Sequence, residues 1–243
     1  MSDLSYIQVR PNILMVADHD QRGFATYCTL IKGSRMALLV DTGFGNIDLR
    51  GFVESQVTTP YMVVNTHSHP DHVGGNNQFD TVWLAEDEIR NMPVYTNNAP
   101  VTHKQNVLTF GQTIDLGDIH VDVVNLGGHT RTCTGYLLRE ERLLVAGDAF
   151  GIGVWLFGPY ALTLKEFRQT LLRTLKLEFD TFLYGHNTEE FPKEQLLSHL
   201  VHLDNIIVDP ATMRLHRDWE TYRSVYRGPH GKSVIKFTLD KVD

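Results

Sequence analysis

One short stretch of the chain concentrates side chains that bind metal ions. Positions 66–72 read Thr-His-Ser-His-Pro-Asp-His, with three histidines and one aspartate within six positions. Neutral imidazole and carboxylate oxygens are the ligands that zinc and similar divalent ions prefer. The spacing does not fit one helix face, which would bring ligands together at i and i+4. The apolar run at 61–64 comes just before it, so we expect a metal-binding loop at a strand end rather than a solvated histidine-rich turn.

Three later segments share a pattern with this loop. Each is an apolar run followed by a glycine and a ligand-type residue: Gly128-His129, Gly147-Asp148 and Gly185-His186. Glycine lets the backbone turn sharply and allows a close approach to a bound ion. Together with the first loop, the chain offers five histidines and two aspartates. That set is large enough for two divalent ions that share one carboxylate.

The elements around these segments must bring them to one place. Apolar runs predict strands at 61–66, 119–126, 143–146 and 182–184, and each one leads into a ligand segment. Helical periodicity predicts helices at 47–56, 163–175 and 192–208. Strands in hairpins, covered by helices, indicate a layered α+β sandwich that forms one unit over residues 1–243.

Two smaller features complete the expected elements. Thr163 and Glu166 have the spacing of a capping box at the start of the helix at 163–175. A helical turn is expected at 86–90, stopped ahead of Pro93, and the segment from Asn91 to Lys104 is expected to be a loop.

Composition limits the class of partner and the compartment. The chain has 243 residues, 42% hydrophobic content and a net charge of −7, which disfavours a nucleic acid held by phosphate neutralisation. Two cysteines, Cys28 and Cys133, are too few for a disulfide framework. No signal peptide and no apolar run of about 20 residues is visible, so we expect a cytoplasmic protein that acts on a small molecule and does not enter a membrane.

The ordered ligand residues resemble those of the metallo-β-lactamase fold superfamily. The motif runs His67-x-His69-x-Asp71-His72, then His129, Asp148 and His186, with Val40-Asp41-Thr42-Gly43 ahead of it, and the resemblance covers about residues 25 to 190. It implies an αββα sandwich with the metal site at one edge of the sheets. Carried over by position, it implies one metal on His67, His69 and His129, a second metal on Asp71, His72 and His186, and Asp148 as the bridge. Asp41 would support the ligand loops by hydrogen bonds.

The resemblance also implies an activity. Two divalent ions per chain, Zn²⁺ first and Mn²⁺ or Fe²⁺ as alternatives, would hold a bridging hydroxide that attacks a small ester, thioester or lactone. Asp148 and Asp71 would be the catalytic carboxylates, with Asp71 orienting the water or moving a proton. Zinc β-lactamases carry Cys or Ser at the position of Asp148, and flavodiiron proteins carry Glu at that of His69. The remaining expectation is a glyoxalase II-like or lactonase-like hydrolase.

Two other functions stay open at this point. A persulfide dioxygenase-like oxidoreductase shares much of the motif but uses a single iron at the first position. A non-catalytic ligand sensor could keep the same fold and ligands. The metal content of the purified protein would separate the first of these from a hydrolase.

The segment at 150–160 is the expected source of substrate contacts. It is aromatic and glycine-rich and directly follows Asp148, so Phe150, Trp155, Phe157 and Tyr160 are candidates for the pocket wall. The alternative is that Trp155 and Phe157 pack in the core or in a homodimer contact, a common arrangement for enzymes. The residues after His186 do not resemble the glutathione-binding helical domain of glyoxalase II, with its clustered basic residues. Four arginines there are a partial signal for such a domain, although a solvated face is the favoured interpretation; they are Arg214, Arg217, Arg223 and Arg227.

Overall fold

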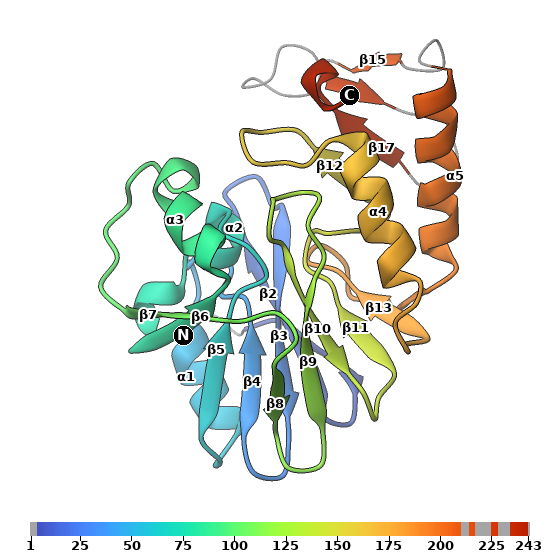
Figure 1. The fold of residues 1–243 in the computed structure, drawn as a ribbon. Helices are drawn as coiled ribbons and strands as arrows, with labels where there is room; N and C mark the ends of the chain where they lie inside the picture. The colour runs from blue at the N-terminus through green and yellow to red at the C-terminus, as the bar shows by residue number, and fades with distance from the viewer. Residues whose placement is uncertain (1–3, 210–213, 217–224, 228–233, 243) are drawn as a thin grey trace.

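The computed structural model describes residues 4–209, 214–216, 225–227 and 234–242. Its strands form two large sheets and one small sheet (Figure 1). The seven strands of the first sheet lie side by side in chain order: β1 (Tyr6–Arg10), β2 (Ile13–His19), β3 (Ala25–Lys32), β4 (Ala37–Val40), β5 (Tyr61–Val64), β6 (Thr81–Leu84) and β7 (Lys104–Val107). The second sheet has the order β14 (Phe191–Pro192), β13 (Thr181–Leu183), β11 (Leu143–Val145), β10 (Thr134–Leu138), β9 (His120–Asn125) and β8 (Thr113–Asp115).

Strand alternation divides the core into layers. In β2, Ile13 and Met15 face the second sheet, whereas Leu14 and Val16 join the cluster that packs under helix α1 (Leu49–Gln56). The outer face of the second sheet packs against α4 (Leu164–Thr174) and α5 (Gln195–Val208). Figure 1 shows α4 and α5 on the opposite side of the sheets from α1. The order is helix, sheet, sheet, helix, which confirms the αββα sandwich.

The direction of the strands explains where the ligand segments meet. Strand β5 is parallel to its neighbours β4 and β6, and β13 is parallel to β11. The carboxyl ends of parallel neighbours lie at the same edge of a sheet. The loops that follow β4 and β5 therefore leave one edge of the first sheet, and those that follow β11 and β13 leave one edge of the second. The two edges lie at the same end of the sandwich, because ligand atoms from loops of both sheets come within 4.8 Å of one another.

The structure corrects the expected end of the helix near Pro93. Helix α3 spans Glu86–Tyr95 with Pro93 inside it, so the predicted loop begins later than Asn91. Met92 is buried, and its carbonyl accepts hydrogen bonds from both the backbone N–H and the hydroxyl of Thr96. Packing of Met92 and this capping at the C-terminus hold the last turn despite the N–H that proline lacks.

A third, four-stranded sheet lies beyond the ligand edge of the sandwich, beside α5 (Figure 1). Its order is β12 (Gly153–Leu156), β17 (Val234–Phe237), β16 (Val225–Arg227) and β15 (Arg214–His216). Four residues of the segment at 150–160 thus form a strand, which pairs in parallel with residues 81 positions later in the chain. A short helix, α2 (Pro70–Val73), follows β5. The capping box of Thr163 and Glu166 at the start of α4 is present as predicted.

Candidate metal centre

The first ligand loop turns directly from a strand into one turn of helix. Beyond the end of β5, Thr66, His67 and Ser68 are fully buried, and α2 begins at Pro70. The backbone N–H of His72 donates to the carbonyl of His69, which closes this turn. The turn directs Asp71 and His72 back toward the loop, so all four ligand-type side chains lie on its inner side.

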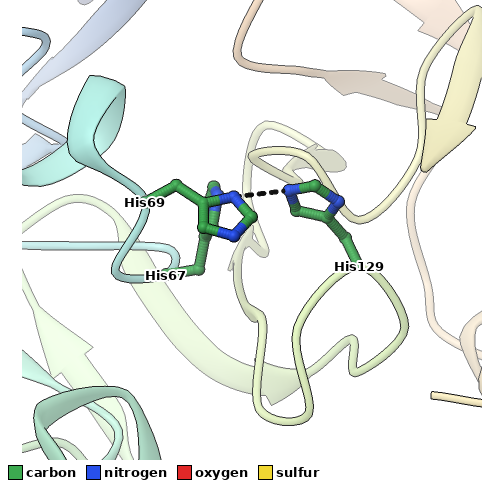
Figure 2. A group of neighbouring side chains, drawn as sticks. All are labelled: His67, His69 and His129. Atoms are coloured by element: carbon green, nitrogen blue, oxygen red, sulfur yellow. Dashed lines mark hydrogen bonds between the residues drawn. The ribbon is translucent and has the colours of Figure 1, made fainter. Parts of the chain in front are cut away.

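The first group of candidate ligands consists of His67, His69 and His129. Their ligand nitrogens all lie within 4.8 Å of one another, and Nε2 of His129 is 2.8 Å from Nδ1 of His69 (Figure 2). Burial lowers the pKa of His67 and of His69 well below the ordinary value, and the neighbouring imidazoles add to this effect. Nδ1 of His129 donates to the carbonyl of Trp155 at 2.7 Å, which leaves a lone pair on Nε2. All three rings are therefore suited to bind a cation.

The second group consists of Asp71, His72 and His186. Oδ2 of Asp71 lies 3.6 Å from Nε2 of His72 and 3.6 Å from Nε2 of His186. Nδ1 of His186 donates to the carbonyl of Ala25 at 2.8 Å, so its Nε2 also faces the group with a lone pair available. Burial opposes charging of His72, but the carboxylates of Asp148, Asp71 and Asp41 outweigh burial and raise the pKa of its imidazole.

Asp148 lies between the two groups. Its Oδ2 is 3.0 Å from Nε2 of His186 and 3.8 Å from Nε2 of His129, and its Oδ1 is 3.4 Å from Nε2 of His72. Burial would raise the pKa of this carboxyl, but the imidazoles of His186 and His72 lower it well below its usual range. An ionised carboxylate thus contacts members of both groups.

Unpaired polar atoms show that the centre suits a cation. Nε2 of His67, Nε2 of His72 and Oδ1 of Asp148 are buried, and none has a hydrogen-bond partner among the described residues. Leaving a buried polar atom unpaired costs about 1–3 kcal/mol. Three such atoms at one place, all of them metal-ligand types, fit a divalent ion.

Asp41 orients one histidine of each group. It accepts hydrogen bonds from the backbone N–H of Thr66 at 2.7 Å, from the Thr66 hydroxyl at 2.8 Å and from Nδ1 of His72 at 2.8 Å. Because that hydroxyl donates to Asp41, it accepts from Nδ1 of His67 at 3.0 Å. Both rings therefore donate through Nδ1 and direct Nε2 toward the centre. The backbone of Asp41 has φ of 63°, a left-handed conformation that aspartate tolerates.

A cavity of about 210 Å³ opens beside the centre. Its walls include the aromatic rings of Phe24, Trp155 and Tyr184, and its floor includes His129, Asp148 and His186. Trp155 is thus placed where the sequence analysis expected a wall. Phe24, in the turn between β2 and β3, and Tyr184, two residues before His186, were missed.

The other three aromatic candidates lie elsewhere. Phe150 is fully buried in the core and contacts Phe182, so the expectation that it lines the pocket is wrong. Phe157 stacks on Trp155 and supports that ring from behind, while Tyr160 contacts Tyr95, whose ring packs on His69. Arg217 and Arg223 lie outside the described residues, and Arg214 and Arg227 are described only as paired backbone positions of β15 and β16.

The fold and the centre define an αββα protein with a histidine- and aspartate-rich metal site. The chain belongs to the metallo-beta-lactamase superfamily, whose family model matches residues 22–226. A metallo-beta-lactamase from Pontibacter korlensis has the same fold, with a TM-score of 0.66 and 18% identity over 84% of this chain and 100% of that one. Of the helices in the described ranges, none combines the length and the hydrophobicity that crossing a bilayer requires.

Two curated relatives are similar over part of their length. A hydroxyacylglutathione hydrolase of Erythrobacter litoralis is 32% identical over 127 residues, covering 49% of this chain and 45% of the relative. The human acyl-coenzyme A thioesterase MBLAC2 is 27% identical over 188 residues, covering 61% of this chain and 66% of the relative. The chain spans about half to two thirds of the length of these relatives.

Proposed function

We propose that the protein is a metal-dependent hydrolase that binds two divalent ions, with Zn²⁺ as the first expectation, and cleaves a small ester, thioester or lactone. The observation that carries the proposal is the position of Asp148 between two groups of three ligands. Both curated relatives are named for the hydrolysis of thioesters, which supports this bond type first. The substrate is a small molecule, bound in the cavity beside Asp148 and His186.

The chain contributes ligands, orientation and a proton acceptor. His67, His69 and His129 would hold one ion, Asp71, His72 and His186 the other, and Asp148 both, as the sequence analysis expected. When bound, such ions supply Lewis-acid chemistry, a nucleophilic hydroxide near neutral pH and polarisation of the reacting carbonyl.

Asp71 is the carboxylate best placed to move a proton. Its Oδ2 accepts a hydrogen bond from the Thr26 hydroxyl at 3.2 Å, and its side chain is partly open to solvent, unlike that of Asp41. A carboxylate in this position can accept a proton from the attacking water and release it to bulk solvent. Substitution of Thr26 by Val would remove the hydrogen bond that orients Asp71 and is expected to lower kcat more than it changes KM.

Metal content and turnover test the proposal together. Protein purified without added metal is analysed for metals, treated with a chelator and reloaded with Zn²⁺, and then assayed on a thioester, an aryl ester and a lactone. We expect two divalent ions per chain and turnover that is lost with the chelator and restored by the ions. One iron per chain with oxygen uptake would instead indicate a persulfide dioxygenase-like oxidoreductase. Two ions with no turnover on any of the substrates would favour a ligand sensor.

A further inference from the structure

The cavity beside the centre has an uncharged aromatic wall. Phe24 packs on His186 with ring centroids 4.6 Å apart, and Tyr184 lies on the same histidine at 6.4 Å. Trp155 forms another part of the wall and is supported from behind by Phe157. Gly153 borders open space, because a Cβ atom added there would lie 3.7 Å from its nearest neighbour, Nε1 of Trp155. The space is thus bounded by rings, with the reactive centre at its floor.

The lining of the cavity disfavours a charged group. Away from the ligand residues at its floor, the described lining consists of Phe24, Gly153, Trp155 and Tyr184, and none of these carries a charge. Lys236 lies on the Trp155 ring, with Nζ 5.4 Å from the centroid, and is not one of the lining residues. An anionic group held between these rings, away from the two ions proposed at the floor, would lose hydration without gaining a paired cation.

The volume indicates the size of the group that fits between the rings. About 210 Å³ corresponds to roughly seven times the share of one water molecule in the liquid. A ring with a short linker or a short alkyl chain fills this space, and the rest of a coenzyme A or glutathione conjugate would extend through the open side of the cavity into solvent.

We propose that the cavity binds the acyl part of the substrate, and that this part is uncharged and apolar, of the size of a phenylacetyl or hexanoyl group. This inference rests on the proposed hydrolase function and adds the acyl class to it. Phe24 is the residue expected to determine specificity, because it closes the cavity from the turn after β2 and is 42% exposed. Its ring would lose its exposed area when the acyl group binds.

Product binding tests the acyl assignment, and turnover tests the hydrolase function on which it rests. Phenylacetate, hexanoate and succinate are titrated into the metal-loaded protein by calorimetry, and the corresponding thioesters of N-acetylcysteamine are assayed. We expect phenylacetate and hexanoate to bind at least tenfold tighter than succinate, and kcat/KM to follow the same order. Phe24→Ala should reduce this preference about tenfold. Tyr6→Ala is the matched control, since Tyr6 is 50% exposed on β1 and does not line the cavity.

Different results would overturn the acyl assignment and the hydrolase proposal. Equal or tighter binding of succinate, or equal losses in the Phe24 and Tyr6 variants, would overturn the acyl assignment and would leave the hydrolase proposal standing. Retained selectivity in product binding with no turnover of any thioester would support the acyl assignment and overturn the hydrolase proposal.

A separate observation concerns a buried carboxylate outside the two ligand groups. Glu88 of α3 is 1% exposed and accepts four hydrogen bonds. Its Oε2 accepts from the backbone N–H of Ser68 at 2.9 Å and from the Ser68 hydroxyl at 2.7 Å. Its Oε1 accepts from the hydroxyls of Thr130 at 2.6 Å and Thr132 at 3.0 Å.

These contacts join the two loops that carry the first ligand group. Ser68 lies between His67 and His69, and Thr130 follows His129 directly. We infer that Glu88 is a positioning residue that holds both loops at the spacing needed for the first ion. A buried carboxylate that accepts four hydrogen bonds is satisfied, so it keeps the loops in place without competing for the ion.

Zinc affinity, measured separately for the two ion positions, tests this role and does not depend on whether the protein has hydrolase activity. Zn²⁺ is removed stepwise from the loaded protein by a competing chelator, and the folded state is followed by circular dichroism. Glu88→Ala is expected to weaken the ion at His67, His69 and His129 by about 10–100-fold and to leave the other nearly unchanged. Glu88→Gln should restore most of the affinity, because its oxygen can accept from Ser68 while its amide donates to the threonine hydroxyls.

Glu86→Ala is the control on the same helix, because Glu86 is exposed and contacts only Arg90 among the described ion pairs. Wild-type affinity at both positions in Glu88→Ala would overturn the inference. If the alanine variant does not fold, the glutamine variant alone decides: loss of both ions equally would indicate a general structural role instead.

Discussion

Replacing Asp41 by asparagine tests how one buried carboxylate sets the protonation of two metal ligands. Asparagine keeps the size and tolerates the left-handed φ of 63°, so no backbone strain enters the comparison. Its one oxygen can still accept from the backbone N–H of Thr66, but its amide then faces the Thr66 hydroxyl and Nδ1 of His72. Both partners must change from donors to acceptors.

That change moves a proton onto the atoms that face the centre. If Nδ1 of His72 accepts, its Nε2 carries the proton, and the same follows for His67 through the Thr66 hydroxyl. A hydrogen bond to a charged group contributes about 1.5–3 kcal/mol, which corresponds to roughly 10–150-fold in binding. We expect Asp41→Asn to weaken both ions by amounts in this range, with the larger effect at His72, which Asp41 contacts directly.

Zinc competition and urea unfolding of the metal-free protein provide the assay. Asp41→Ala is the second variant, because it also removes the hydrogen bonds and adds about 1–2 kcal/mol for alanine in a left-handed conformation. The alanine variant should therefore be less stable than the asparagine variant without metal. Wild-type zinc affinity in Asp41→Asn, or equal stability of the two variants, would refute the reasoning.

Three further predictions concern the bridge, a buried histidine and a helix cap. Asp148→Ala should lose both ions by elemental analysis, while His186→Ala should weaken mainly the second; full occupancy in either would contradict the assignment. Burial lowers the pKa of His199 to about 4, so this residue stabilises the fold fully above its unfolded pKa of 6.5 and loses that contribution as the pH falls. Between pH 7.5 and 5 the loss is about 2 kcal/mol, and urea titrations of His199→Gln should lack it. Thr163→Ala should lower the free energy of unfolding by about 1 kcal/mol, and Thr163→Ser should not.

The ligand groups could be predicted because each depends on local signals. Each ligand residue follows the carboxyl end of a strand, and parallel pairing places the carboxyl ends of neighbouring strands at the same edge of a sheet. The capping box at Thr163 was predictable for the same reason, since four consecutive residues contain the whole motif. The start of α5 was not predictable in this way. The sequence predicted a helix from residue 192, but Phe191–Pro192 pairs with β13, and the helix begins at Gln195.

The wall of the cavity could not be predicted, because it depends on distant pairing. Strand β12 exists through its parallel contact with β17, and the strand alternation then directs Val154 into the core and Trp155 to the cavity. Without that strand, every aromatic residue of the segment was an equal candidate, and Phe150 was assigned wrongly. Glu88 gave no signal either, because it sits in an acidic first turn of α3 that resembles a solvated helix start.

The same distant pairing couples the substrate wall to the metal centre. The carbonyl of Trp155 accepts the hydrogen bond that fixes Nδ1 of His129, while the Trp155 side chain forms the cavity wall. A shift of β12 would therefore change the wall and the orientation of a first-group ligand at once. His186 is linked in a similar way, since Nδ1 donates to the carbonyl of Ala25, directly after Phe24. Each ion would thus have one histidine that is oriented by the backbone of a wall segment. Changes in substrate preference that move these segments are expected to alter metal affinity, whereas changes confined to the rings of Phe24 and Trp155 leave both carbonyls in place.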